Sequence, residues 1–241
     1  MSYISLDSST SSTTVVVFDK DLNIQKKFQK EHQQIHTSEG FVEHDLEEIY
    51  NNLIELIKKA AEIAPDPQLI SITNQRETFT LFDKLTGKPV RNAVVWQCTR
   101  GEEICEKILN NKEYSELITQ KTGLKANTFF SASKLKWVIE NEPHIKEGLI
   151  KGNILFGTVD TYLLYRLTKC KEYVTDTTNA SRTLLFNCID ICWDNELFSI
   201  FEIEQLKLAD VKSSSSNFGS SNFENSFLKE IPISGVAGDA Q

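Results

Sequence analysis

The chain contains 241 residues, of which 40% are hydrophobic and 25% charged, proportions that are ordinary for a globular protein with one large domain or two small ones. Its net charge of -8 and the absence of a Lys/Arg cluster argue against nucleic acid as a main partner. No apolar run is long enough to span a membrane, and the first residues lead directly into a short strand instead of a secretory leader. We therefore expect a cytoplasmic protein.

The cysteines and histidines do not form a pattern typical of a metal site. The five cysteines are odd in number and contain no CxxC pair, which favours reduced thiols over a disulfide scaffold or a zinc site. Cys188 and Cys192 are predicted to be buried core residues, because no histidine accompanies them. The four histidines form no ligand cluster and are predicted to be solvated: His32, His36, His44 and His144.

The first part of the chain predicts a three-stranded antiparallel meander, with strands over residues 3–7, 13–18 and 24–32. The turn between the first two strands, residues 8–12, is rich in hydroxyl groups and follows Asp7 directly. A loop is predicted over residues 33–44. Asp45 is then typical of a helix N-cap, with Glu48 placed to complete a capping box, and apolar residues recur at helical spacing until Pro65 and Pro67 end the helix.

Strands and helices alternate over the rest of the chain. Strands are predicted over residues 69–73, 79–83, 93–96, 154–156 and 231–239, with a further one at 184–186. Helical patterns cover residues 113–149, with breaks at 121–123 and Pro143, and shorter helices contain Cys105, follow Thr158 and begin at Trp193. Residues 175–182 and 213–223 are predicted turns or loops. This order predicts an α/β domain with a mixed sheet and flanking helices.

The end of one predicted strand is unusually polar. Residues 70–73 alternate apolar and small polar side chains, and residues 74–77 then present Asn, Gln, Arg and Glu in a row. Such groups are expensive to bury unless they are paired, and ligands of open α/β sheets lie at strand ends. Adjacent Arg76 and Glu77 offer donors and acceptors suited to a ligand with several hydroxyl groups. On spacing alone, an ordinary surface ion pair is slightly favoured.

Seven stretches in the same order along the chain resemble the N-terminal half of glycerol kinases, within the FGGY family of carbohydrate kinases. They are Asp7 with Thr10-Ser11-Ser12 and residues 41–45, 72–78, 92–97, 156–161, 178–183 and 235–239. A set of six residues also fits the spacing of a signature of the whole family: Phe129, Ser131, Lys134, Trp137, Glu140 and Asn141. The resemblance runs from residue 3 to residue 241, and residues 74–78 point to the glycerol-specific members.

The resemblance implies an actin-like, RNase H-like ATPase domain over residues 1–241. Family members carry two such domains with the active site between them, so we expect this chain to be the first domain, with the second, C-terminal ATPase domain absent. That second domain would supply most adenosine contacts. The expected partners are glycerol and either a second copy of the chain or a chain that carries the C-terminal domain.

The resemblance also implies the reaction, ATP-dependent phosphorylation of glycerol to glycerol 3-phosphate with Mg²⁺. Asp239 would be the catalytic base and would also contact the substrate, and Arg76, Glu77 and Phe129 would bind glycerol. Asp7 would hold Mg²⁺, while Thr10, Ser11 and Ser12 would surround the ATP phosphates. From the residues alone, Asp239 could instead be a helix N-cap, and the hydroxyl-rich turn a plain surface hairpin. Residues 157–161 and 179–182 are predicted to be scaffold.

Several positions depart from the family pattern. Ser8 replaces a Gln, Ser9 a Gly, Thr14 an Arg, Phe129 a Tyr and Ala240 a Gln. If the position of Ser9 needs a positive φ, serine there costs roughly 1–2 kcal/mol. These departures, together with the expected absence of the second domain, motivate one alternative, a degenerate non-catalytic glycerol kinase-like binding protein. A kinase of another sugar or polyol is a further alternative, which the intact residues 74–78 disfavour.

Overall fold

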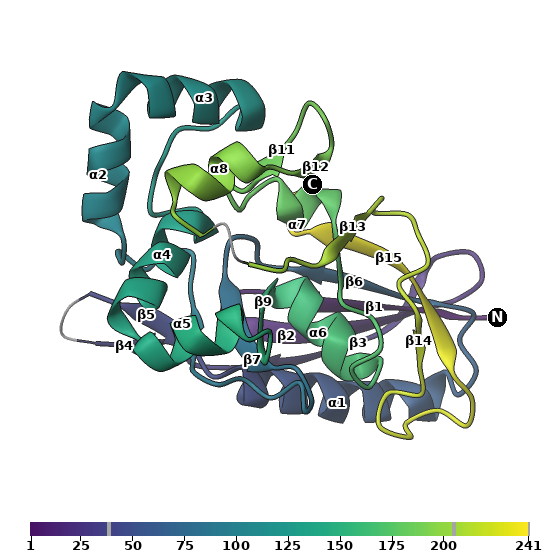
Figure 1. The fold of residues 1–241 in the computed structure, drawn as a ribbon. Coiled ribbons are helices and arrows are strands. Elements are labelled where there is room, and N and C mark those ends of the chain that lie inside the picture. Colours follow the sequence, from purple (N-terminus) through teal and green to yellow (C-terminus); the bar gives the residue numbers. More distant parts are fainter. Residues whose placement is uncertain (38–39, 204–205, 241) are drawn as a thin grey trace.

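The computed structural model describes residues 1–37, 40–203 and 206–240, and its centre is a six-stranded mixed sheet (Figure 1). The strand order is β14-β15-β6-β1-β2-β3. The strands are β1 (Tyr3–Ser8), β2 (Ser12–Phe18), β3 (Ile24–Glu31), β6 (Ile70–Asn74), β14 (Ser220–Ser221) and β15 (Ile231–Gly238). The predicted meander is confirmed, because β1, β2 and β3 pair antiparallel in sequence order. β6 pairs parallel with both β1 and β15, which makes the sheet mixed as predicted.

A five-stranded sheet lies beside the first, in the order β4-β5-β8-β7-β9. Its strands are β4 (Ile35–His36), β5 (Val42–His44), β7 (Phe79–Asp83), β8 (Ala93–Val94) and β9 (Ile154–Thr158). The prediction of a loop over residues 33–44 was therefore partly wrong, because β5 pairs with β8 and β4 pairs with β5. Strands of two or three residues are too short to show an alternating pattern in the sequence.

Two small ladders complete the strands. β10 (Val174–Asp176) pairs with β13 (Asp210–Lys212), and β11 (Phe186–Asn187) pairs with β12 (Cys192–Trp193). β10 and the short helix α7 (Thr177–Ala180) occupy the segment predicted to be a polar turn. A single turn of helix directly after a strand places several polar side chains in a fixed arrangement beside β15, which α7 contacts.

Helix α1 (Leu46–Ile63) begins where the sequence predicts. The Asp45 carboxylate accepts hydrogen bonds from the backbone N–H groups of Glu47 and Glu48, which confirms the N-cap. One face of α1 is buried and contacts β1, β2 and β3. Figure 1 shows α1 along the lower side of the strand layer and α6 (Val159–Leu167) across its front. Thr158 precedes α6 as predicted, but its hydroxyl makes no capping hydrogen bond.

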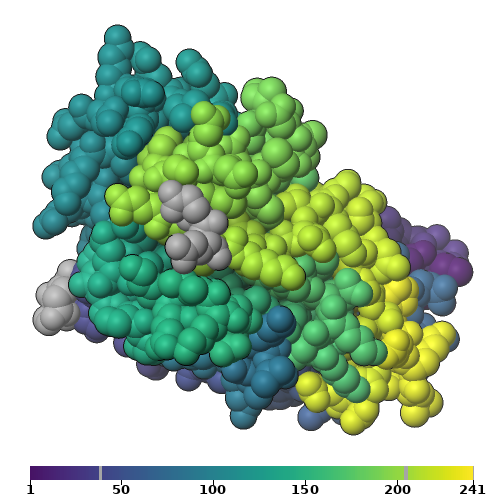
Figure 2. All heavy atoms as spheres, viewed as in Figure 1, coloured from purple at the N-terminus to yellow at the C-terminus, as the bar shows by residue number. Residues whose placement is uncertain are grey.

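The remaining helices gather around the five-stranded sheet. They are α2 (Glu102–Asn110), α3 (Lys112–Thr122), α4 (Ser131–Asn141), α5 (Pro143–Ile150) and α8 (Asn195–Ile200). The breaks predicted at residues 121–123 and at Pro143 are confirmed, since Gly123 ends α3 with a left-handed backbone and Pro143 opens α5. Figure 2 shows the α2–α3 pair projecting from the upper left of the molecule.

Four predictions about single side chains need correction. Cys188 and Cys192 are exposed and not core residues, because they flank the protruding tip of the β11–β12 hairpin. His32 and His44 are buried and not solvated, with ring centroids 5.1 Å apart. They point inward because His32 continues β3 beneath the β1–β2 turn and His44 ends β5. Across the described residues, no helix is both long and apolar enough to cross a bilayer.

Candidate active site

Three parallel strands deliver polar side chains to one edge of the six-stranded sheet. Asn74, the last residue of β6, pairs with Ser8 of β1 on one side and with Gly238 of β15 on the other. The Asp239 N–H donates to the Asn74 carbonyl oxygen over 3.0 Å, which extends the β15–β6 ladder by one residue. The sheet therefore brings the segments after Asp7, Asn74 and Gly238 together, where open α/β sheets bind ligands.

Arg76 and Asp239 form an ion pair at this edge, with the Arg76 Nε atom 3.4 Å from the Asp239 Oδ1 atom. The Asp239 side chain is 43% exposed and the Arg76 side chain only 15%. Gly238 makes this arrangement possible, because a Cβ atom there would lie 2.3 Å from Arg76 Cδ and 2.5 Å from Arg76 Cγ. The result is an accessible carboxylate beside a guanidinium group that is held against the strand.

Glu77 is the most constrained residue of the edge. It is buried, and its φ of 61° lies in the left-handed region that non-glycine residues rarely adopt. Its carbonyl oxygen accepts a hydrogen bond from the Ser131 hydroxyl over 2.8 Å, and its Oε1 atom accepts from Arg182 Nε over 2.6 Å. Burial raises the pKa of Glu77, and the positive charges of Arg182 and Arg76 oppose this rise. Backbone strain at a strand end, held by buried contacts, is typical of functional sites.

Arg182 lies in a stretch that the sequence predicts to be scaffold, yet it is the direct charge partner of Glu77. Its guanidinium carbon also lies 4.8 Å from the ring centroid of Phe130 and 5.8 Å from that of Phe129. A buried carboxylate requires a cation, but no local pattern shows which of the chain's cations supplies it, since Glu77 and Arg182 are 105 positions apart. Sequence reasoning therefore missed this residue.

Phe129 and Trp96 form an aromatic pair, which we call the aromatic wall. Their ring centroids are 5.0 Å apart. The Trp96 indole N–H donates to the Thr10 hydroxyl over 3.1 Å, and the Trp96 backbone N–H donates to the Thr78 hydroxyl over 3.1 Å. Trp96 thus connects the β1–β2 turn to the segment after β6. It belongs to a matched stretch, but it was not predicted as a site residue.

The other polar side chains after β6 are satisfied inside the protein. The Asn74 side chain exchanges hydrogen bonds with Asn179 at 2.9 and 3.2 Å, and Asn179 also donates to Asp176 over 2.8 Å. The Thr178 hydroxyl accepts from the Gly238 N–H over 2.8 Å. Asn179 thus holds β6, and Thr178 holds β15. This leaves Arg76 and Glu77 as the residues of this stretch with charges directed at the edge.

The turn after β1 is built mainly from neutral groups. The Ser9 N–H donates to the Ser12 carbonyl oxygen over 3.0 Å, and the Ser12 hydroxyl accepts from Gln29 over 3.0 Å. The predicted penalty at Ser9 does not arise, because its backbone is not left-handed. Among the hydrogen bonds of the described residues, the backbone N–H groups of Thr10 and Ser11 donate none. Two such donors at the tip of a hairpin are suited to an anion.

Asp7 is partly buried at the base of this turn. Burial raises the pKa of its carboxyl group, a hydrogen bond of 2.7 Å from the Ser9 hydroxyl opposes the rise, and Asp239 adds to it. The Asp7 Oδ1 atom is buried and has no hydrogen-bond partner within the described chain. Mg²⁺ typically takes one or two carboxylate ligands together with phosphate oxygens and water. An unpartnered carboxylate oxygen close to a second carboxylate therefore fits such an ion.

Thr14, on β2, pairs directly with Asp7 of β1 and carries no charge. Lys27 of β3 is a cation close enough to Asp7 for its charge to oppose the rise in the pKa of that carboxyl group. Lys27 pairs with Val16, two residues from Thr14, so the register places Lys27 on the same face of the sheet as Asp7. Lys27 thus provides positive charge near the turn from an exposed strand.

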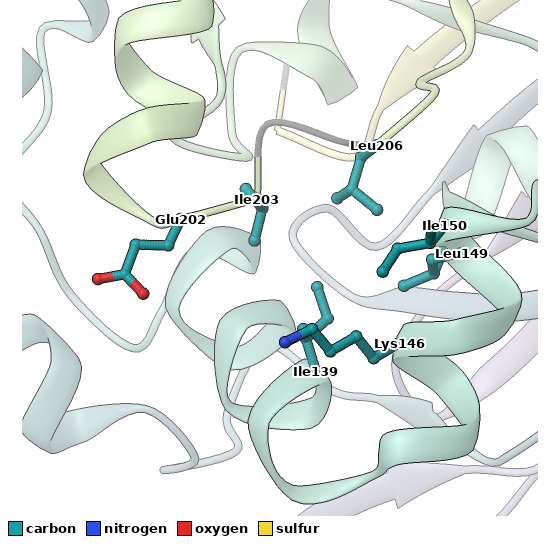
Figure 3. Close-up of a pocket in the computed structure, with 7 residues that line it drawn as sticks. All are labelled: Ile139, Lys146, Leu149, Ile150, Glu202, Ile203 and Leu206. Carbon is teal, nitrogen blue, oxygen red and sulfur yellow. The ribbon is translucent and has the colours of Figure 1, made fainter.

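A separate hollow lies between α4, α5 and the segment after α8 (Figure 3). Its lining is mainly aliphatic, with Lys146 and Glu202 as the charged members, and it shares no residue with the strand-end cluster. Its carboxylate, that of Glu202, is largely exposed and already paired with Lys136, so the strand ends remain the candidate active site.

The mixed sheet with flanking helices, together with the polar ends of its parallel strands, defines a domain of the actin-like ATPase class. Solved structures with this fold cover nearly the whole chain. Plasmodium falciparum glycerol kinase with ADP superimposes with a TM-score of 0.93 at 38% identity, over 99% of this chain and 48% of that chain. Xylulose kinase from Lactobacillus acidophilus superimposes with a TM-score of 0.87 at 21% identity, a likeness of fold alone.

The chain belongs to the FGGY family of carbohydrate kinases, since residues 2–241 match the N-terminal domain of that family. Glycerol kinase 2 of Thermotoga maritima is 46% identical over 100% of this chain and 49% of its own length. Glycerol kinase of Thermococcus onnurineus is 47% identical over 99% of this chain and 48% of its own length. The chain therefore spans about half the length of the curated relatives that it matches.

Proposed function

We propose that this chain provides the polyol-binding half of a glycerol kinase, an enzyme that transfers the γ-phosphoryl group of ATP to a terminal hydroxyl of glycerol. The observation that carries the proposal is the Arg76–Asp239 ion pair beside the buried, strained Glu77. The glycerol kinases among its relatives support glycerol as the substrate and ATP as the donor.

In the proposed mechanism, Asp239 accepts the proton of the reacting hydroxyl, because its carboxylate is accessible and positioned by the β15–β6 ladder. Arg76 donates to the substrate hydroxyls, and the Glu77 Oε2 atom, which makes no hydrogen bond within the described chain, accepts from them. Phe129 and Trp96 pack against the carbon chain of glycerol. These groups hold the nucleophile in position, which is a large part of catalysis in phosphoryl transfer.

The phosphate side of the proposed site is the turn from Ser8 to Ser12. Backbone N–H groups of Thr10 and Ser11 would donate to the ATP phosphates, and Asp7 would hold Mg²⁺. When bound, Mg²⁺ neutralises charge that develops on the phosphate oxygens. We expect a smaller contribution from the Ser12 hydroxyl, because it is buried and accepts a hydrogen bond from Gln29. A cytoplasmic location is also proposed, supported by five cysteines that are all free.

A non-catalytic glycerol-binding protein is the second candidate. Thr14 and Phe129 favour it, since each lacks a polar group that the family carries at that position. A coupled assay for glycerol 3-phosphate distinguishes the two candidates when the chain is tested alone and together with the C-terminal half of the Thermotoga maritima relative. We expect little turnover from the chain alone and measurable turnover from the mixture, abolished by Asp239→Asn. Glycerol binding without turnover in either sample would favour the binding protein.

Calorimetry on the chain tests the substrate class. We expect glycerol to bind more tightly than xylulose, and Arg76→Met to weaken glycerol binding by about tenfold or more, the effect of losing one charged hydrogen bond. Tighter binding of xylulose would overturn the choice of substrate.

A further inference from the structure

Lys134 is a member of the family signature that the proposed mechanism does not use. It lies on α4, and its side chain is completely buried. Its ammonium group donates three hydrogen bonds to backbone carbonyl oxygens, those of Trp96 at 3.2 Å, Thr128 at 2.6 Å and Phe129 at 3.1 Å. The three donors of a lysine ammonium group are therefore all used, and all by carbonyl groups of two segments that are distant in sequence.

A lysine at this position needs an explanation beyond packing. Burial of an ammonium group is costly, and here it lowers the pKa of Lys134 to about 7. No carboxylate lies within hydrogen-bond distance of the Lys134 Nζ atom in the described chain, and the acidic groups that oppose the fall in its pKa are those of Cys98, Glu77 and Cys105. An apolar side chain such as Met would fill similar volume without this cost. Three hydrogen bonds from Lys134 to carbonyl groups offset part of this cost.

Two of those carbonyl groups belong to the residues of the aromatic wall. The same helix also holds the acidic side of the site, since Ser131, in its first turn, donates to the Glu77 carbonyl oxygen. One rigid element thus fixes the backbone of Trp96, Phe129 and Glu77 at once. Trp96 in turn reaches the β1–β2 turn through its hydrogen bond to Thr10.

We propose that Lys134 is a positioning residue of the polyol site, which sets the spacing of the Trp96 and Phe129 rings by tying their backbones to α4. The proposal rests on the proposed function, because the rings bind the carbon chain of the substrate. Its effect is on substrate affinity and geometry, since the ammonium group is buried behind the backbone and does not touch the substrate.

The test compares Lys134→Met with Lys136→Met, a control on the same helix whose lysine pairs with Glu140 and Glu202 away from the site. Hydrogen exchange measured by mass spectrometry should be about tenfold faster or more at residues 95–98 and 127–130 of Lys134→Met, with other segments unchanged. Glycerol affinity of Lys134→Met, measured by calorimetry, should fall about tenfold or more, while Mg-ATP affinity stays within about twofold. Lys136→Met should match the parent chain in all three measurements.

Lys134→Arg extends the test to head-group geometry. The planar guanidinium group of arginine keeps the charge but cannot donate to all three carbonyl oxygens from one point. Lys134→Arg should therefore resemble Lys134→Met, and not the parent chain, in hydrogen exchange and glycerol affinity. If Lys134→Met does not fold, Lys134→Arg and Lys134→Gln carry the comparison. Unchanged exchange at residues 95–98 and 127–130, a uniform rise over the whole chain, or unchanged glycerol affinity would overturn the proposal. A parent chain that binds no glycerol would overturn the proposed function, while hydrogen exchange still decides the positioning role.

Discussion

The two halves of the candidate site are built by different means, although both lie at one edge of one sheet. The polyol half contains two ion pairs, Arg76–Asp239 and Arg182–Glu77, a strained backbone at Glu77 and a close approach at Gly238. The phosphate half, residues 8–12, has an ordinary backbone, hydroxyl groups and free N–H donors. From this contrast we infer that the polyol half is organised before a ligand arrives, whereas under the proposed function the phosphate half would depend on charges that Mg²⁺ and the nucleotide bring.

Removal of the Glu77 carboxylate should have the largest effect on the polyol half. Glu77→Ala leaves Arg182 partly buried and without its partner, so we expect the free energy of unfolding in urea to fall by about 3 kcal/mol, the low end for a broken buried pair because Arg182 is partly solvated. Glycerol binding should be lost in calorimetry.

Two further variants sharpen this prediction. Glu77→Gly accommodates the positive φ without strain, so it should be more stable than Glu77→Ala by about 1 kcal/mol. Addition of Arg182→Met to Glu77→Ala should recover part of the lost stability, because the unpaired cation is removed. If Glu77→Ala unfolds at the same urea concentration as the parent chain, the polyol half is not held together by this pair.

The close approach at Gly238 gives the second prediction. Gly238→Ala places a Cβ atom against Arg76, so it should move the guanidinium group away from Asp239 and lower the free energy of unfolding by about 2 kcal/mol. Glycerol affinity should fall by about tenfold or more. Gly235→Ala on the same strand is the matched control, because its Cβ atom would meet only Ser71 Cβ at 3.5 Å and Ser214 O at 3.9 Å. Equal effects of the two variants in thermal unfolding and calorimetry would contradict the argument.

The sequence proposed the residues of the polyol half from local signals together with the family resemblance, and these assignments stay predictions. Four polar residues in a row after an alternating strand marked residues 74–77, and the flanking glycine marked Asp239. β1, β6 and β15 lie far apart in the sequence, and their parallel pairing, which the sequence pattern did not predict, brings their carboxyl ends together. Residues that support the site from a distance, such as Arg182 and Trp96, had no local signal, since their partners are fixed only by the tertiary structure.

Single-residue environments were predicted least well. Exposed Cys188 and buried His44 each contradict the usual preference of their residue type, because a hairpin tip projects one and a three-residue strand buries the other. The backbone penalty that was expected at Ser9, if its φ were positive, does not arise. A family pattern with glycine does not show whether that glycine is needed for its φ or for close approach by a ligand.

Ser9→Gly tests how the phosphate half is stabilised. This change restores the family pattern but removes the hydrogen bond to Asp7 and adds backbone freedom to the unfolded chain. We expect the free energy of unfolding in urea to fall by about 1 kcal/mol. Ser9→Ala separates the two causes, since it loses only the hydrogen bond and should fall less. A gain of stability with glycine would show that the turn is strained and would make the two halves of the site more alike.

Asp7→Asn should have the smallest effect on stability, and unlike the other variants it should raise the free energy of unfolding. Burial and the charge of Asp239 raise the pKa of Asp7 above its usual 3.8, so the folded protein holds the proton more tightly than the unfolded chain. The contribution of Asp7 to stability therefore decreases as the pH rises from 3.8 through the raised pKa, and the ionised carboxylate is a net cost at pH 7. Asparagine removes that cost, so the variant should be slightly more stable than the parent chain at pH 7, by less than about 1 kcal/mol because solvent screens the group. Urea unfolding at pH 7 and below pH 3.8 checks this, since the difference should disappear at the lower pH.

A less stable variant at pH 7 would mean that the Ser9 and Lys27 interactions outweigh burial, and that the phosphate half is organised before its ligand as firmly as the polyol half.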